Sequence, residues 1–176
     1  DNRVRLNLAT FYADYDDIQI NVQSDPTDIS VTDVINAGKA TITGLEMDLS
    51  ARLTDGLTAS LNYAYLDASY DKIIDATGAD ISSQFQFIEA PHSSYSANLQ
   101  YEFPATPIGV FTAIVDYSWQ GEMFTSTADK RYVTDDYGLL NARLNLAHIP
   151  VGTGDLRVGL WGRNLEDKGY YASAFN

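Results

Sequence analysis

The amino-acid sequence predicts an all-β fold in which antiparallel, meandering strands form part of a transmembrane β-barrel. Three observations predict this fold: apolar and polar residues alternate along most of the 176-residue chain, the alternating segments are long, and short and long connections follow one another in turn. The segments run for roughly ten residues or more, which suits a tilted membrane crossing and exceeds the usual five or six residues of a soluble strand. No stretch approaches the roughly 18 consecutive apolar residues of a transmembrane helix.

The alternation is clearest between Ser94 and Phe103, where every odd-numbered residue is apolar or aromatic and every even-numbered residue is polar. Successive side chains of a strand point to opposite faces, so this segment has one apolar face and one polar face. A helix would instead group apolar residues three and four apart. The same pattern predicts eight strands, over residues 3–14, 17–24, 39–53, 57–70, 92–103, 109–121, 136–148 and 155–165. We expect the first strand to run towards the periplasm and the eighth to return to the cell exterior.

The connections and the aromatic residues indicate how the strands cross the membrane. Residues 54–56, 104–108 and 150–154 are short and rich in Gly and Pro, whereas the stretches near 24–40, 71–91, 121–136 and 166–176 are long, acidic and polar. Short periplasmic turns and long outer loops are typical of outer-membrane barrels, as are two girdles of aromatic residues. We expect one girdle to contain Tyr63, Tyr65, Tyr95, Tyr117, Trp119 and Tyr137. We expect the other to contain Tyr12, Tyr15, Tyr101, Phe103 and Phe111.

Composition excludes several other classes of protein. The net charge is −13, which argues against nucleic acid as a partner because a phosphate-binding face needs clustered Lys and Arg. Cysteine is absent, so the chain has neither a disulfide framework nor a thiolate metal site. We expect no cofactor and no resident metal ion.

No group of residues predicts catalysis. His92 and Ser93 are adjacent, and in a strand adjacent side chains point to opposite faces, so they cannot form a nucleophile and base pair. Asp71, Asp75 and Asp80 are acidic loop residues, but their spacing does not match an EF-hand loop. We expect a solvated acidic loop, and we expect the protein not to be an enzyme.

The polar faces of the strands carry the charged residues that we expect to face the barrel lumen. These are Glu46, Asp48, Arg52, Glu102, Asp116, Arg143, Arg157 and Arg163. We interpret them first as a hydrated wall whose charges pair with one another or with a domain filling the barrel, and second as direct contacts to substrate. In the outer loops and at their rim, the residues placed to stack on a substrate, or simply to sit in a girdle, are Phe85, Phe87, Trp119 and Phe124.

Four segments, at residues 11–19, 36–46, 53–68 and 161–170, resemble in this order the barrel domain of TonB-dependent outer-membrane receptors. The stretch 36–46 is similar to a loop that re-enters the barrel wall with Gly-(hydrophobic)-Glu, and 11–19 is similar to the aromatic and acidic hairpin before it. Residues 53–68 resemble the next hairpin, and residues 161–170 (WGRNLEDKGY) resemble the family's near-terminal Asn-Leu-x-(Asp/Asn)-(Lys)-x-Tyr segment. The resemblance implies a barrel of 22 strands around an N-terminal plug. It also implies that residues 1–176 are the C-terminal portion of that barrel, strands fourteen to twenty-one, with the plug domain, the TonB box and the final strand absent.

The same resemblance implies the function. It predicts an outer-membrane active-transport receptor of a Gram-negative bacterium, energised by TonB, that takes up a scarce nutrient such as a ferric siderophore, cobalamin or an oligosaccharide. This segment would form barrel wall and outer loops. Its partners would be outer-membrane lipid and lipopolysaccharide, a small-molecule substrate, and the TonB complex through the missing N-terminal region. A passive porin shares the strand pattern but needs an open, conducting lumen, and a soluble carbohydrate-binding β-protein needs no detergent for extraction.

Overall fold

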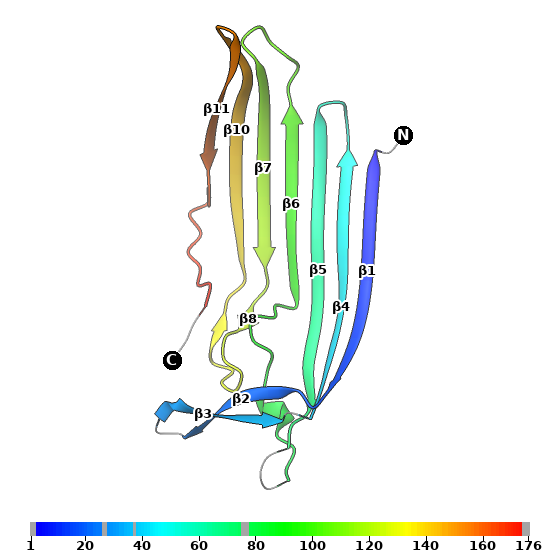
Figure 1. Cartoon of the computed structure of the whole chain (residues 1–176), viewed down its shortest axis with the longest axis vertical. Coiled ribbons are helices and arrows are strands. Elements are labelled where there is room, and N and C mark those ends of the chain that lie inside the picture. The colour runs from blue at the N-terminus through cyan, green and yellow to red at the C-terminus, as the bar shows by residue number, and fades with distance from the viewer. Residues whose placement is uncertain (1–2, 26–27, 37, 75–77, 174–176) are drawn as a thin grey trace.

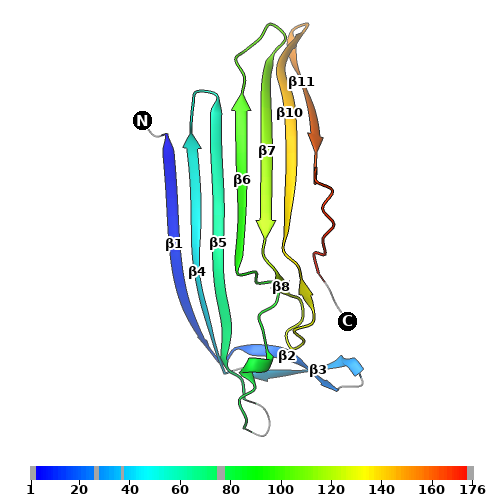
Figure 2. The same ribbon diagram turned by 180° about the vertical axis from the view of Figure 1, so that it is seen from behind.

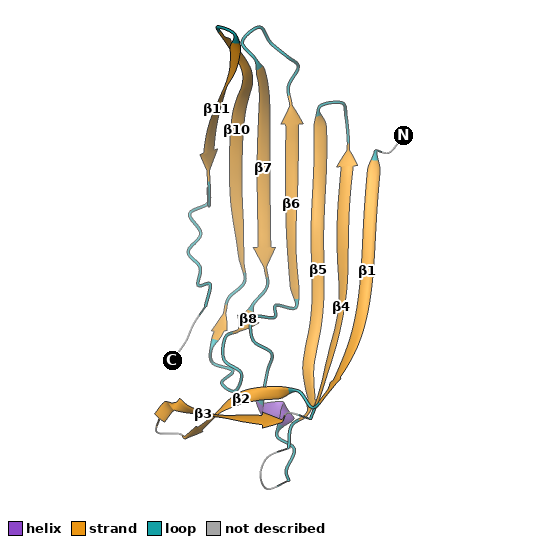
Figure 3. Ribbon diagram, viewed as in Figure 1, coloured by secondary structure: helices purple, strands orange, loops and turns teal. Residues whose placement is uncertain are grey.

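The computed structural model describes residues 3–25, 28–36, 38–74 and 78–173, and its main feature is an antiparallel sheet of seven long strands (Figures 1 and 3). In spatial order the strands are β1 (Val4–Asp16), β4 (Lys39–Arg52), β5 (Leu57–Lys72), β6 (Ser93–Glu102), β7 (Val110–Gln120), β10 (Tyr137–Val151) and β11 (Gly154–Gly162). Each of these strands pairs with the sheet strands before and after it in the chain, so the sheet is a meander. The predicted fold class, all-β with antiparallel meandering strands, is therefore confirmed.

The two ends of the sheet differ. Short turns at residues 53–56, 103–109 and 152–153 lie at one end, which we call the turn end, and the long connections lie at the other, the loop end (Figures 1 and 2). The loop end also carries the 3-10 helix η1 (Ser82–Gln84) and the two-residue strands β8 (Met123–Phe124) and β9 (Val133–Thr134). Among the described residues, no helix is long and apolar enough to cross a membrane.

The register confirms that one face of the sheet is apolar and the other polar. Residues paired directly across antiparallel strands point to the same face. One such row consists of Val4, Ala51, Ala59, Leu99, Val115 and Ala142. The adjacent row, on the opposite face, consists of Arg5, Ser50, Ser60, Asn98, Asp116 and Asn141. Leu99 pairs with Val115 and Glu102 pairs with Thr112, which places Leu99 and Glu102 on opposite faces as predicted.

The prediction that residues 17–24 form a strand of the wall is wrong. β1 pairs directly with β4, from Asp16 opposite Lys39 to Val4 opposite Ala51. Residues 17–24 instead begin a separate hairpin in which β2 (Gln19–Asp25) pairs with β3 (Asp28–Asn36). Asp17 adopts a positive φ of 58°, and its N–H donates to the carbonyl of Gly38 at 2.6 Å. The chain leaves the sheet at this point, so the sheet has seven strands, and β1 runs from the turn end to the loop end instead of the predicted opposite direction.

The small buried core lies at the loop end, under the β2–β3 hairpin. Ile20 and Ile73 are buried against each other, with Ile18, Tyr70, Ile81 and Phe85 packed around them. In contrast, the apolar face of the sheet is covered by no described element. Leu99 and Leu160 on that face are 46% and 74% exposed. An apolar surface of this extent indicates contact with lipid or with another protein.

Aromatic residues form a row at the loop end of the apolar face, as predicted for that girdle. Tyr63, Tyr95 and Trp119 are paired in register, and the rings of Tyr95 and Trp119 stack with centroids 5.4 Å apart. At the turn end, Tyr101 and Phe103 pack edge to face at 4.6 Å.

Three aromatic residues differ from the expected positions. Tyr12 and Tyr15 pair with Thr43 and Ala40, so they lie at the loop end, away from Tyr101. The prediction for these two is wrong because β1 runs in the opposite direction. Tyr137 pairs with Gln120, which places it on the polar face.

Candidate functional site: the polar face and the joined loops

The register places the predicted lumen-facing residues of the strands on the polar face. Seven of them alternate along their strands with the residues of the apolar face: Glu46, Asp48, Arg52, Glu102, Asp116, Arg143 and Arg157. Arg163 follows the last residue of β11 and lines the same hollow as Arg143. These residues do not converge on one point but extend across the sheet.

Two hollows follow this face. The first, about 540 Å³, lies over the middle strands towards the loop end and is lined by Glu46, Asp48 and Tyr137. The second, about 960 Å³, lies towards β10 and β11 and includes Asp116, Arg143, Trp161, Arg163 and Tyr170. Between the charged residues the lining includes hydroxyl and carboxamide side chains, such as Asn62, Ser96 and Ser118, which suit contact with water or a polar ligand, together with aromatic and small apolar residues.

The charges on the polar face do not pair with one another. Arg52 contacts Asp55 of the adjoining turn at 3.4 Å, and Asp116 accepts a hydrogen bond from Asn98 Nδ2 at 2.8 Å. In the part of the chain that the structure describes, the other six predicted residues have no ion-pair or side-chain hydrogen-bond partner: Glu46, Asp48, Glu102, Arg143, Arg157 and Arg163. Four of them line the hollows, Glu46 and Asp48 the first and Arg143 and Arg163 the second, so their charges are free to interact with a ligand there.

The segment after β11 is held against β10 by Asn164. Its backbone N–H donates to Asn141 Oδ1 at 3.0 Å, and its side chain donates to the carbonyl of Lys168 and accepts from the N–H of Lys168. Beyond this turn, the ring of Tyr170 stacks on Tyr137 at 4.3 Å. The Asn and the Tyr of the near-terminal motif therefore have a physical role, which is to fix residues 163–170 along the polar side of β10.

Two aromatic residues of the larger hollow, Trp161 and Tyr170, were not among the predicted site residues. Trp161 lies directly opposite Arg143 in the register and is 62% exposed. The sequence signal for Trp161 is its position between Arg157 and Arg163 on the polar side of β11, and the signal for Tyr170 is the motif itself.

The four predicted aromatic residues of the loops and their rim are dispersed. Phe85 packs on the Ile20–Ile73 core, and Trp119 lies on the apolar face with its indole N–H donating to Asp136 at 3.0 Å. Phe87 stacks on Tyr70 at 4.3 Å, and Phe124 forms β8. Only Phe87 and Phe124 meet, in the lining of a cavity of about 100 Å³.

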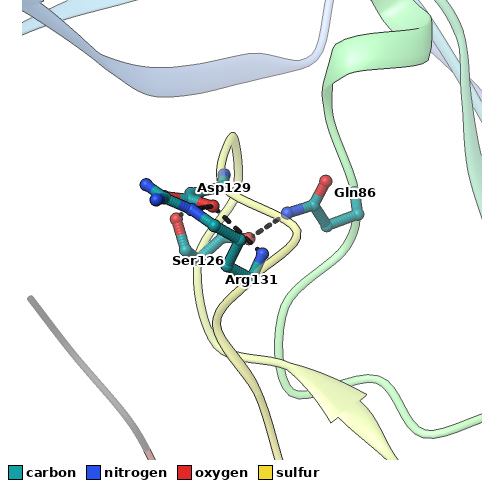
Figure 4. A network of polar contacts seen from close by, with 4 residues as sticks. All are labelled: Gln86, Ser126, Asp129 and Arg131. Carbon is teal, nitrogen blue, oxygen red and sulfur yellow. Dashed lines mark hydrogen bonds and ion pairs between the residues drawn. The ribbon is translucent and has the colours of Figure 1, made fainter.

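The loops at 78–92 and 121–136 are bound to each other, and we call them the joined loops (Figure 4). Gln86, which is 8% exposed, donates from Nε2 to the carbonyl of Ser126 at 2.5 Å and from its backbone N–H to the carbonyl of Thr127 at 2.9 Å. Lys130 Nζ donates to the carbonyl of Ser83 at 3.0 Å. Two loops that are far apart in sequence therefore form one unit.

An ion pair shapes the second of the joined loops. Arg131 contacts the carboxylate of Asp129 at 2.7 Å through its guanidinium, and its backbone N–H also donates to that carboxylate (Figure 4). These hydrogen bonds lower the pKa of Asp129 to about 2.

The residues that the sequence analysis rejected as a catalytic pair or a metal site have other partners. The imidazole Nδ1 of His92 lies 3.0 Å from the carbonyl oxygen of Leu66, whereas the hydroxyl of Ser93 lies 3.3 Å from that of Tyr63. Asp80 accepts from the backbone N–H groups of Ser82 and Ile73, which lowers its pKa. Asp75 lies outside the described residues. Within the described ranges, no three His, Cys, Asp or Glu side chains gather to hold a metal ion.

Comparison with known proteins adds the family context. The family model described as "TonB dependent receptor-like, beta-barrel" matches residues 1–165. The metal-pseudopaline receptor CntO of Pseudomonas aeruginosa is 25% identical over all 176 residues, which correspond to 23% of its own length.

Solved structures share the fold. The ferric yersiniabactin uptake receptor FyuA of Yersinia pestis has a TM-score of 0.73 at 18% identity, covering 100% of this chain and 24% of that one. The ferric preacinetobactin receptor BauA of Acinetobacter baumannii has a TM-score of 0.67 at 14% identity, covering 96% of this chain and 24% of that one. The chain thus spans about a quarter of the length of the proteins that it matches.

Proposed function

The chain belongs to the TonB-dependent receptor-like β-barrel family, and from this premise we propose that it forms wall strands and outer loops of a receptor for a metal chelate in a Gram-negative outer membrane. The observation that carries this proposal is the family match along residues 1–165. The similarity of residues 161–170 to the family's near-terminal segment supports a place in the C-terminal part of the barrel.

The physical properties of the sheet support this assignment. In the proposal, the apolar face contacts lipid, the polar face lines the lumen, the turn end faces the periplasm and the loop end faces the exterior. An apolar band flanked by aromatic girdles, with alternate residues facing a polar interior, is what a lipid bilayer requires of a barrel wall. The outer loops would then lie among lipopolysaccharide.

The relatives favour one substrate class among those that the sequence left open. The names of CntO, FyuA and BauA refer to a metal-pseudopaline, a ferric yersiniabactin and a ferric preacinetobactin receptor. We therefore propose a metal chelate of the siderophore type, in preference to cobalamin or an oligosaccharide. Energy from the inner membrane, delivered through TonB to a plug within the barrel, would drive uptake.

Deleting the gene of the intact receptor tests the substrate class. Uptake of ⁵⁵Fe-loaded siderophores, radiolabelled cobalamin and labelled oligosaccharides is measured in the deletion strain and in the same strain carrying the gene. We expect the gene to restore uptake of a metal chelate and of neither other class. Restored uptake of cobalamin or an oligosaccharide alone would contradict the proposed substrate, and ion conductance of the purified protein in a planar bilayer would favour a porin.

A further inference from the structure

The arginines of the sheet are confined to one face. Although the chain carries a net charge of −13, Arg5, Arg52, Arg143 and Arg157 all project from the polar face, and Arg163 lines the larger hollow beside it. The remaining arginines are Arg3, which immediately precedes β1, and Arg131, in the joined loops. The polar face thus concentrates guanidinium groups in an otherwise acidic chain.

Two of these arginines flank an exposed indole. Arg143 of β10 is directly opposite Trp161 of β11, and Arg163 lies two residues beyond Trp161. The hydrogen bond from Asn164 N–H to Asn141 fixes the backbone next to Arg163 against β10. Tyr170, which is 46% exposed, lines the same hollow of about 960 Å³. We call Arg143, Trp161, Arg163 and Tyr170 the arginine–tryptophan cluster.

The guanidinium groups of the cluster have no carboxylate partner in the described part of the chain. The carboxylate of the same hollow, Asp116, accepts from Asn98 instead. A guanidinium presents a planar fork of N–H donors that matches two oxygens of a carboxylate, and it forms its strongest hydrogen bonds with charged acceptors. Indole and phenol rings beside it offer flat faces on which a planar ligand group stacks.

We propose that the arginine–tryptophan cluster binds the carboxylate groups of an anionic metal chelate within the barrel. This inference rests on the proposed function, because it takes the polar face to be the lumen of a metal-chelate receptor. Carboxylate is the group that fits best, since a carboxylate of the chelate that does not bind the metal presents both oxygens to the guanidinium fork, and one that binds the metal through a single oxygen keeps the other free to accept. The carboxamides Asn141 and Asn164 in the lining are neutral, so they do not repel the anion.

Equilibrium binding to the intact, detergent-solubilised receptor tests this inference. The probes are ⁵⁵Fe(III)–citrate, which carries carboxylate groups, and a ⁵⁵Fe(III) trishydroxamate without carboxylates. The variants are Arg143→Gln, Arg163→Gln and the double substitution. The control is Arg5→Gln, which removes the same charge from the same face outside the hollow.

We expect each single substitution to weaken citrate-complex binding about tenfold and the double substitution to weaken it more, because each removes a charge-assisted hydrogen bond. The trishydroxamate should bind equally to all variants, and Arg5→Gln should match the wild type. Arg143→Lys, which keeps the charge but not the fork, should retain intermediate affinity. The unfolding midpoint of every variant shows whether it is folded.

Several results would overturn the inference. Unchanged citrate binding in the double variant would do so, as would a wild-type receptor that does not bind the citrate complex. An equal loss of both probes, with a lowered unfolding midpoint, would show that the arginines hold a domain inside the barrel and not the chelate. The proposed function is tested separately, because TonB-dependent uptake of any metal chelate would persist if only the carboxylate assignment were wrong.

Discussion

The assignment of the apolar face to lipid is tested by placing an arginine on each face of the same strand. Leu99 lies midway between Tyr95 and Phe103, four residues or about 13 Å along the strand from each aromatic ring position. Its side chain is paired with Ala59 and Val115 on the apolar face and is 46% exposed. Leu99→Arg would therefore place a guanidinium near the middle of the bilayer, where such a substitution costs about 2–4 kcal/mol.

Ser96→Arg is the matched control on the polar face of the same strand. Ser96 pairs with Asn62 and Ser118, and its hydroxyl accepts from Asn62 at 3.2 Å. Losing this neutral hydrogen bond costs about 0.5–1.5 kcal/mol, and the new charge enters a hydrated lumen. Unfolding by urea of the intact receptor in lipid vesicles measures both variants. Equal destabilisation of the two, or a larger effect of Ser96→Arg, would refute the face assignment.

Further predictions concern the joined loops and a side-chain contact between the paired strands β1 and β4. Gln86→Ala should increase amide hydrogen exchange across residues 121–136, because Gln86 joins the two loops; unchanged exchange would show that the loops are held elsewhere. Because the pKa of Asp129 is lowered to about 2, its ion pair should stabilise the loop above about pH 4 and lose that effect as the pH falls towards 2. Hydrogen exchange of the loop between pH 5 and 2 should show this loss of protection. In Arg131→Gln, which has no ion pair to lose, the loop should show no such change between pH 5 and 2. Gly44→Leu should destabilise the receptor by about 1–3 kcal/mol in urea unfolding, since a Cβ at Gly44 would run into the ring of Phe11; Phe11→Ala should relieve part of the cost.

The faces of the sheet could be predicted from sequence because the alternation of side chains is local. The odd and even residues around Leu99 separate without knowledge of any partner strand, and the observed register agrees. Neighbours within the hollows could not be predicted in this way. Arg143 meets Trp161 only through the register of β10 with β11, and a bulge between Leu146 and Ile149, where His148 has a φ of 57°, shifts that register.

The path of residues 17–24 shows the main limit of the alternation. Ile18 and Ile20 are spaced as in a wall strand, but the same spacing serves a hairpin whose apolar side is buried on Ile73. Period two identifies a strand but not the strand with which it pairs. The alternation therefore predicts a membrane-crossing strand at residues 17–24, where the structure has a hairpin. For the same reason it predicts the wrong direction for β1 and the wrong end of the sheet for Tyr12 and Tyr15. The contact between the joined loops also could not be predicted from local sequence patterns, because Gln86 and Ser126 are 40 residues apart.

The central claim is that this sheet belongs to the wall of an importer that depends on TonB. The most direct measurement is uptake of the ⁵⁵Fe-loaded cognate chelate by cells that carry the intact receptor, with and without TonB, alongside binding of the same chelate to the cell surface. We expect uptake to collapse without TonB while surface binding remains, because a plugged lumen does not pass solute by diffusion and the outer loops are already assembled. Uptake that continues undiminished without TonB would contradict the receptor assignment.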